Sequence, residues 1–297
     1  MRFLYVAPRY HTNQVPIIRG LKRKGHEVCF LSQYAGKVED YSDLTPTVIG
    51  YSRIFLFFDR IYVALMKNRD AYAGDRKMKC GFPPIGKLKR AIRDSHGDVA
   101  VLRERSVYSI CAYLLCKKYK IPAILYNQSP LWEDCIKNDP AHRLMRLLTP
   151  TVRMTPVMGV QNGRKVKEPG AAFVPFVMEP EQKAEEKRWI KDGITHIFSI
   201  GKYEERKNHR MLVEIVEELS AVYNIHLTIA GERTTSAHQA YYDRLAAYIA
   251  NHGLQDKVTL LVNLNRQQVA EQYRKADLFV IPSTREPASI SQLEAMA

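Results

Sequence analysis

Short apolar runs alternate with longer amphipathic patterns along the whole chain. This alternation is typical of βα units, in which helices cover a parallel sheet. The apolar residues between the first two runs share one helical face, and Gly25 is expected to end this helix at its C′ position. These apolar residues are Val15, Ile17, Ile18 and Leu21. The apolar runs of the first half predict strands at 2–7, 26–31, 98–103, 121–126 and 170–175.

The second half repeats the pattern more regularly. It predicts, in chain order, strand 194–200, helix 208–222, strand 225–230, helix 237–252, strand 257–262, helix 266–275, strand 277–282 and a helix from 290. Between the halves, residues 178–192 mix acidic and basic side chains with few apolar ones, which favours a linker. A chain of 297 residues fits two domains of ordinary size. The sequence therefore predicts a first domain at 1–176, a linker at 177–193 and a second domain at 194–297.

Composition and motifs narrow the class of protein. An apolar content of 46% with 10% aromatics is typical of a globular protein. No apolar run approaches the roughly 20 residues of a membrane-spanning helix. The strand-like start leaves no room for a signal peptide, so a cytoplasmic protein is expected. The five cysteines lack Cys-x-x-Cys spacing, and the chain has no Asp-x-Asp and no histidine pair at helical spacing. No metal and no cofactor are therefore expected.

The net charge of +14 is confined to the first half. Residues 1–175 carry 30 Lys and Arg against 14 Asp and Glu, whereas residues 176–297 carry 15 against 17. Such a basic surface suits anionic lipid, acidic glycan or nucleic acid, and it is also compatible with a merely solvated face. Nucleic acid is not expected as a partner, because interleaved aromatics and known motifs are missing. The densest basic residues are Arg60, Lys67, Arg69, Arg76, Lys77, Lys79, Lys87, Lys89, Arg90 and Arg93.

The most informative segment lies at the end of the chain. Glu286 and Glu294 stand eight positions apart across a turn that opens into a helix. Ser289 is a good N-cap residue for this helix, and Gln292 completes the sequence of a capping box. Free N–H groups at a helix start favour a diphosphate, while carboxylates accept hydrogen bonds from sugar hydroxyls. The segment therefore suits an activated sugar.

This segment resembles the Glu-x7-Glu signature of the retaining family 4 glycosyltransferases, which have the GT-B fold. The run Thr195-His-Ile-Phe-Ser-Ile-Gly201-Lys202 and the runs from Leu227 and Leu254 are similar to the family's donor domain, in the same order. The resemblance implies an α/β protein with two Rossmann-like domains that face each other across a cleft. The family's donor domain continues for several more elements, so the resemblance also implies that the second domain is incomplete here. The missing Asp-x-Asp motif argues against the metal-dependent GT-A type.

The resemblance assigns roles to individual residues. Glu286 is expected beside the donor sugar and Glu294 at the ribose, and the family's Arg and Lys at the diphosphate correspond to Lys202 and Lys207. Lysine keeps the charge of arginine but loses its planar fork. Catalytic roles are expected for Glu286 and Lys207. Donor-binding roles are expected for Gly201, Lys202, Lys207, Ala288, Ser289, Ile290 and Glu294. Acceptor-binding roles are expected for Arg103, Arg105 and Asn127.

The expected activity is metal-independent, retaining transfer of a hexose from a nucleoside-diphosphate sugar to a cell-envelope glycan or lipid. Two alternatives stay open: a noncatalytic binding or scaffold protein with the GT-B fold, and a nucleotide-sugar epimerase. In the family, the acceptor domain often carries a basic amphipathic patch that lies on the inner membrane leaflet. The apolar residues at 54–66 predict a helix for such a patch, and the alternative is a helix packed on its own sheet.

Overall fold

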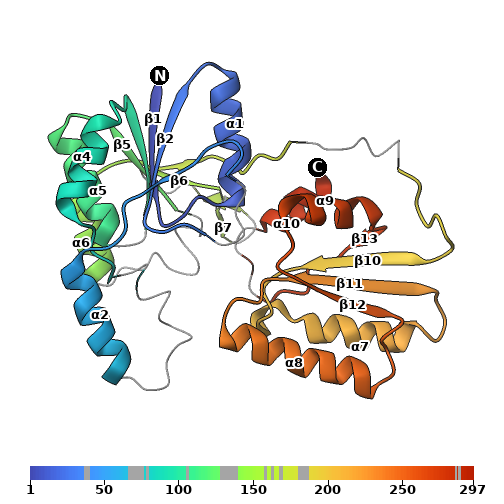
Figure 1. The fold of residues 1–297 in the computed structure, drawn as a ribbon. Helices are drawn as coiled ribbons and strands as arrows, with labels where there is room; N and C mark the ends of the chain where they lie inside the picture. Colours follow the sequence, from blue (N-terminus) through green and yellow to red (C-terminus); the bar gives the residue numbers. More distant parts are fainter. Residues whose placement is uncertain are drawn as a thin grey trace. The chain divides into compact units, whose positions relative to one another are not determined.

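The structure is a computed structural model, and it describes residues 1–36, 41–65, 77, 80–104, 107–127, 140–156, 159–161, 164–166, 170–179, 187–284, 286 and 289–297. The chain divides into two compact units, Met1–Val177 and Met178–Ala297 (Figure 1). The predicted linker at 177–193 stays a prediction, because residues 180–186 lie outside the described part of the chain.

The first unit is built on a parallel sheet with the strand order β3-β2-β1-β4-β5-β6-β9. The strands are β1 (Arg2–Ala7), β2 (Glu27–Ser32), β3 (Thr47–Val48), β4 (Val99–Arg103), β5 (Ala123–Tyr126), β6 (Arg153–Thr155) and β9 (Ala171–Phe173). The helices are α1 (Val15–Arg23), α2 (Arg53–Leu65), α4 (Ile85–Asp94), α5 (Val107–Lys118) and α6 (Pro140–Leu148), with a 3-10 turn η1 (Thr12–Gln14) before α1. Gly25 follows α1 with a φ of 75°, so the predicted C′ glycine is confirmed. A short antiparallel hairpin, β7 (Gly159–Gln161) with β8 (Arg164–Val166), was not predicted.

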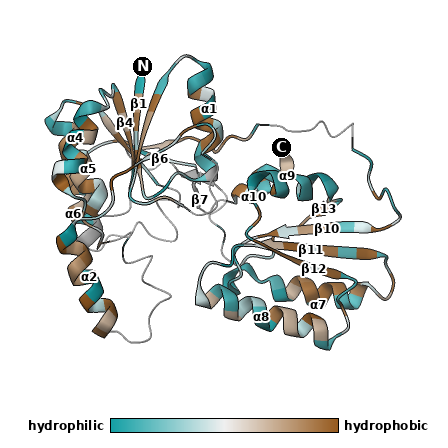
Figure 2. Cartoon of the chain, viewed as in Figure 1, coloured by the Kyte–Doolittle hydropathy of each residue, from teal (hydrophilic) through white to brown (hydrophobic). Residues whose placement is uncertain are grey.

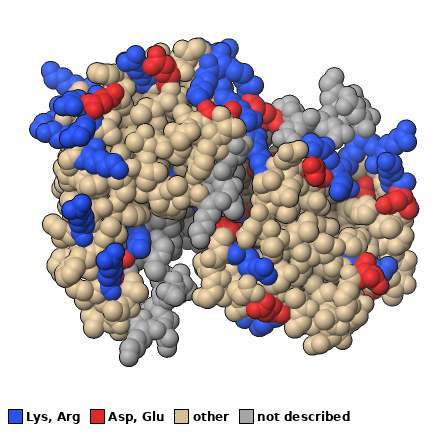
Figure 3. Space-filling model, viewed as in Figure 1, with Lys and Arg blue, Asp and Glu red and all other residues tan. Residues whose placement is uncertain are grey.

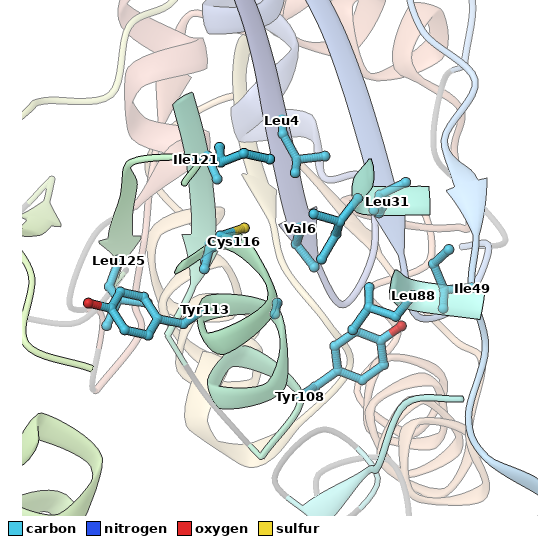
Figure 4. Packing of buried hydrophobic residues seen from close by; sticks show 14 residues of the cluster. Leu4, Val6, Leu31, Ile49, Leu88, Tyr108, Tyr113, Cys116, Ile121 and Leu125 are labelled. Atoms are coloured by element: carbon cyan, nitrogen blue, oxygen red, sulfur yellow. The ribbon is translucent and has the colours of Figure 1, made fainter. Parts of the chain in front are cut away.

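Alternate residues of β1 face the two sides of this sheet, as the period of a strand requires. Leu4 and Val6 belong to the apolar cluster under α4 and α5, where they meet Leu88 and Tyr108 (Figure 4). Tyr5 and Ala7 belong to a second cluster, which α1 covers with Val15 and Ile18. Helices therefore cover both faces of the sheet, and its carboxyl edge stays available for polar residues.

Helix α2 is the exception to this packing. Phe57 and Phe58 are 61% and 62% exposed, and Asp59 is the one residue of the helix that is buried. The Asp59 carboxylate lies 3.4 Å from Lys77 Nζ. Figure 2 shows the apolar residues along this helix. The alternative in which the helix buries its apolar side chains on its own sheet is therefore wrong for the residues that the structure describes.

The second unit has a parallel sheet with the order β12-β11-β10-β13. Its strands are β10 (Thr195–Ile200), β11 (Ile225–Gly231), β12 (Val258–Val262) and β13 (Leu278–Phe279). Its helices are α7 (His209–Leu219), α8 (Ser236–Asn251), α9 (Arg266–Lys275) and α10 (Ile290–Met296), with a 3-10 turn η4 (Glu205–Lys207) before α7. Helices α7 and α8 pack on one face, through Leu212 and Leu245, and Tyr273 of α9 packs against Phe198 of β10. The last strand is shorter than the predicted 277–282, since only Leu278 and Phe279 pair with β10.

Candidate functional site

The loop after β10 carries the first group of predicted donor-binding residues. It runs from Gly201 through Lys202 and Tyr203 to the turn η4, which ends at Lys207. Tyr203 is fully buried, and its hydroxyl donates to the carbonyl oxygens of Ile229 at 3.1 Å and Leu261 at 2.8 Å. Because these carbonyls belong to the next two strands, Tyr203 fixes the loop to the carboxyl edge of the sheet.

Lys207 and Glu286 meet at this edge although they lie 79 positions apart in the chain. The Lys207 ammonium donates to the Glu286 carboxylate, and the two side chains are 13% and 22% exposed. The backbone supports this pair, since the Thr284 N–H donates to the Arg206 carbonyl at 3.1 Å. A partly buried ion pair is held more firmly than a pair in open water. The structure therefore brings the two predicted catalytic residues together.

Arg206 is a second cation beside Glu286, and it was not predicted from the sequence. Its guanidinium lies 3.4 Å from the Glu286 carboxylate and 2.6 Å from that of Glu204. Two cations thus face Glu286, and Arg206 is shared between the carboxylates of Glu286 and Glu204. The sequence carried only a weak signal for Arg206, because it neighbours Lys207 in an exposed charged run.

Gly201 gives Lys207 the space to lie across the loop. A Cβ at Gly201 would stand 2.9 Å from Lys207 Cδ. Gly231, at the end of β11, faces the same loop, because a Cβ there would stand 2.6 Å from the Gly201 carbonyl oxygen. A side chain at Gly231 would displace the loop, whereas one at Gly201 would displace the Lys207 side chain. The two glycines therefore allow a close approach between the ends of β10 and β11.

Lys202 has a different partner from Lys207. Its ammonium lies 3.8 Å from the carboxylate of Glu232, just beyond β11, and its side chain is 44% exposed. The predicted lysine pair thus flanks the loop, and each lysine faces its own carboxylate.

The segment at 286–297 holds the remaining predicted donor-binding residues. Ser289 Oγ accepts from the Gln292 N–H at 3.2 Å, so the predicted N-cap is confirmed, and Ile290 begins α10. Glu294 accepts from the Tyr273 hydroxyl at 3.1 Å. Burial, and then the charge of Glu294, raise the pKa of Tyr273 well above its usual range. Glu294 is thereby tied to α9, and Ala288 lies outside the described residues.

The predicted acceptor residues lie at the carboxyl edge of the first unit's sheet. The Arg103 guanidinium stands 5.2 Å over the Tyr126 ring at the ends of β4 and β5. Asn127 follows Tyr126, and its N–H donates to the Met154 carbonyl at 2.9 Å. Arg105 lies outside the described residues. Two polar groups that were not predicted lie nearby: the buried Asn13 amide donates to the Tyr126 hydroxyl at 3.3 Å, and Glu104 pairs with Arg153 at 2.9 Å.

A hollow of about 640 Å³ opens at the other end of the second unit's sheet. It lies at the amino ends of β10 and β13, away from Lys207 and Glu286. Its basic lining residues are Lys187, Arg188, Lys191, Arg274 and Lys275. Asp277, which also lines it, accepts from the N–H groups of Ile190 at 2.9 Å and His196 at 2.8 Å. Ligands of open parallel sheets bind at the carboxyl ends of the strands, and this hollow lies at the opposite end.

Metal-binding residues do not cluster in the described part of the chain. No group of three or more His, Cys, Asp or Glu side chains there is arranged to hold a metal ion.

Residues 181–297 match the family model described as Glycosyl transferases group 1. The matched residues include the loop after β10 and the segment with both glutamates. Mannosylfructose-phosphate synthase of Agrobacterium fabrum is 27% identical to this chain over 104 residues. That match covers 34% of this chain and 23% of that protein, so the chain matches less than a quarter of the curated relative's length.

Several solved structures resemble nearly the whole chain, and two of them are a glycosyltransferase and the protein HepE. A glycosyltransferase from Rickettsia africae superposes with a TM-score of 0.65 at 14% identity, over 99% of this chain and 76% of the other. The Anabaena protein HepE, solved in complex with UDP and glucose, superposes with a TM-score of 0.63 at 12% identity, over 100% of this chain and 78% of the other. At such identities the likeness concerns the fold. The predicted α/β fold with parallel sheets, of the GT-B type, is confirmed.

The resemblance to group 1 glycosyltransferases is also confirmed for residues 181–297. The narrower assignment to family 4 and the incompleteness of the second domain stay predictions.

Proposed function

We propose that this chain is a retaining, metal-independent glycosyltransferase that takes a hexose from a nucleoside-diphosphate sugar. The observation that carries the proposal is the contact between Lys207 and Glu286. It joins a cation and a carboxylate at the carboxyl edge of a parallel sheet, inside the segment that matches the family model. Ligands of open α/β sheets bind at this edge.

Each residue has a role in the proposed reaction. The bond between the anomeric carbon and the diphosphate breaks, and its electron pair goes to the diphosphate oxygen. Lys207 and Lys202 stabilise that developing charge. Glu286 accepts hydrogen bonds from the sugar hydroxyls. The acceptor hydroxyl bonds to the anomeric carbon and loses its proton, which leaves with the diphosphate.

The other donor-binding residues surround this centre in the proposal. Gly201, Ala288, Ser289 and Ile290 offer backbone groups to the donor, and Glu294 binds the ribose. The Tyr273 hydroxyl already donates to the Glu294 carboxylate, and this hydrogen bond fixes the orientation of the carboxylate.

We place the acceptor on the first unit, at Arg103, Arg105 and Asn127, and propose a cell-envelope glycan or lipid. The excess positive charge of residues 1–175 suits an acceptor with acidic groups. Arg103 supports this assignment, because it stands at the carboxyl edge of the sheet.

Thermal unfolding in the presence of UDP, GDP and ADP, and of their sugars, tests the donor site. One nucleotide series is expected to raise the Tm, since a ligand at about 100 times its Kd stabilises a protein by about 2.7 kcal/mol. The shift is expected to disappear in Lys207→Ala and to persist in Lys275→Ala, an exposed lysine at the end of α9. No response to any nucleotide would contradict the proposal and favour a scaffold protein. A changed sugar released without any acceptor would favour an epimerase.

We further propose that the first unit binds an anionic lipid surface through α2, at the inner face of the membrane. No helix among the described residues is long and apolar enough to cross a membrane. The exposed apolar side chains of α2 lie on the same helix as Arg53 and Arg60, and Lys77 is close by. Figure 3 shows Lys and Arg side chains over this unit. Apolar and cationic groups together match an interface of acyl chains and anionic headgroups.

Vesicle flotation tests this surface. The chain is expected to float with vesicles that contain phosphatidylglycerol and not with pure phosphatidylcholine. Replacing both Phe57 and Phe58 with serine is expected to weaken binding at least about tenfold, because burial of one such side chain contributes about 1.5–3 kcal/mol. Val222→Ser, at a 76% exposed valine of the second unit, is the control and is expected to bind as the wild type. Equal flotation of all three proteins would refute a role for α2.

A further inference from the structure

His209, the first residue of α7, is buried in a place where an apolar side chain would be expected. It is 1% exposed, and neither ring nitrogen makes a well-formed hydrogen bond with the described residues. Buried polar groups are almost always hydrogen-bonded, and leaving one unpaired reduces stability. The two buried nitrogens of His209 therefore call for an explanation.

The surroundings of His209 point to the loop after β10. The Tyr203 ring meets the imidazole edge-on at 5.7 Å, and the Tyr241 ring lies at 6.4 Å. The backbone groups of Gly201 and Lys202 face the imidazole. The imidazole therefore lies directly against the loop on which Lys202 and Lys207 stand.

His209 is uncharged at physiological pH. Burial is the main cause that lowers its pKa, to about 4, and the charge of Lys207 acts in the same direction. The carboxylate of Glu204 and the backbone groups of Gly201 and Lys202 act in the opposite direction. A neutral imidazole carries one N–H donor and one acceptor nitrogen. The carbonyl groups of the loop lie near this N–H donor.

We infer that His209 is a positioning residue of the donor site, which holds the backbone of Gly201 and Lys202 for a diphosphate. Hydrogen bonds at active sites are often long or poorly aligned without ligand and tighten in the complex. With a diphosphate bound to the loop, the imidazole N–H donates to a loop carbonyl and fixes the direction of the lysines. This inference rests on the proposed function, because the loop is the proposed diphosphate loop.

His209→Phe separates this role from simple packing. The phenyl ring keeps the contacts with Tyr203 and Tyr241 and removes both unpaired nitrogens, so the variant is expected to be at least as stable as the wild type. Its affinity for the nucleotide that stabilises the wild type, and for inorganic pyrophosphate, is expected to fall about fivefold, the effect of one lost hydrogen bond. His209→Gln retains an N–H donor and is expected to recover part of the affinity. His226→Phe, at the amino end of β11, is the matched control and is expected to bind as the wild type.

The pH dependence of stability gives a second readout. Between pH 6.5 and about 4 the unfolded chain binds a proton at His209 and the folded chain does not, so stability falls as the pH falls through this window. His209→Phe is expected to lose this part of the acid sensitivity.

Unchanged ligand affinity in His209→Phe would overturn the inference. A loss of stability in step with affinity, or a variant that does not fold, would overturn it too, because His209 would then serve packing. If the wild type itself binds neither pyrophosphate nor any nucleotide, the proposed function fails first, and the inference fails with it.

Discussion

Lys207→Ala is expected to lower kcat/KM for sugar transfer about 100-fold or more. Removal of one fixed group that stabilises developing charge costs about 10²–10³-fold in rate, and Lys207 is the cation held most firmly at the site. Lys202→Ala is expected to cost less, because its side chain is more exposed and solvent screens its charge. Lys275→Ala is the matched control at the other end of the sheet, and it should transfer sugar as the wild type does.

Glu286→Gln is the complementary variant. It is expected to keep or raise nucleotide affinity, whereas Lys207→Ala is expected to lower it. The amide keeps the shape of the side chain but releases Lys207 from its ion pair. Transfer is therefore expected to fall about 100-fold through misplacement of the sugar, while nucleotide affinity stays equal or increases. Steady-state rates and calorimetric titration separate the two effects. If Glu286→Gln turns over as fast as the wild type, Glu286 has no catalytic role.

Gly231→Ala is expected to destabilise the second unit by about 3 kcal/mol, near the upper end for overpacked cores. The new Cβ would stand 2.6 Å from the Gly201 carbonyl oxygen and 2.6 Å from a ring carbon of Tyr203. Neither neighbour can withdraw, because one is backbone and the other is fully buried and hydrogen-bonded to two strands. The loop that carries Lys207 is expected to shift with it.

Urea unfolding measures this effect. The control is Gly20→Ala in α1, where a Cβ meets nothing within 4 Å. That variant is expected to be unchanged or slightly more stable, since alanine is favoured over glycine within a helix by about 0.5–1 kcal/mol. Equal unfolding midpoints for Gly231→Ala and the wild type would show that the loop adapts, and that the close approach of β10 and β11 is not needed.

The sequence predicted the strands and helices of the second unit well, because each apolar run is bounded by turn residues and each helix has one apolar face. The last strand was overestimated: residues 277–282 are apolar enough for a strand, but strand length depends on the partner, and β10 pairs only with Leu278 and Phe279. The hairpin of β7 and β8 was missed, although the sequence Asn162-Gly163 between its strands is the strongest short-range hairpin signal. A complete capping box forms at Asn265 and Gln268, where none was predicted.

The part of the site that depends on the parallel strand order could be predicted from the sequence. Residues that follow neighbouring parallel strands meet at one edge, so the contact of Lys207 with Glu286 follows from the strand order. The roles of Arg206 and His209 could not be predicted, because arginines in charged runs and histidines at helix starts are both common. The burial of His209 depends on Tyr203 and Tyr241, which come from other segments. The orientation of α2 could not be predicted either, because its apolar residues cover much of the helix circumference. Nothing in the sequence indicates that Asp59 is buried.

The most direct measurement is a crystal structure of the chain with the nucleoside diphosphate that stabilises it. We expect the diphosphate at the carboxyl edge of the second unit's sheet, with a phosphate oxygen within about 3 Å of Lys207 Nζ and with Glu286 beyond the terminal phosphate, where the donor sugar would lie. A diphosphate bound elsewhere, such as in the basic hollow at Lys187 and Lys275, with Lys207 still paired to Glu286 and in contact with no phosphate, would contradict this assignment.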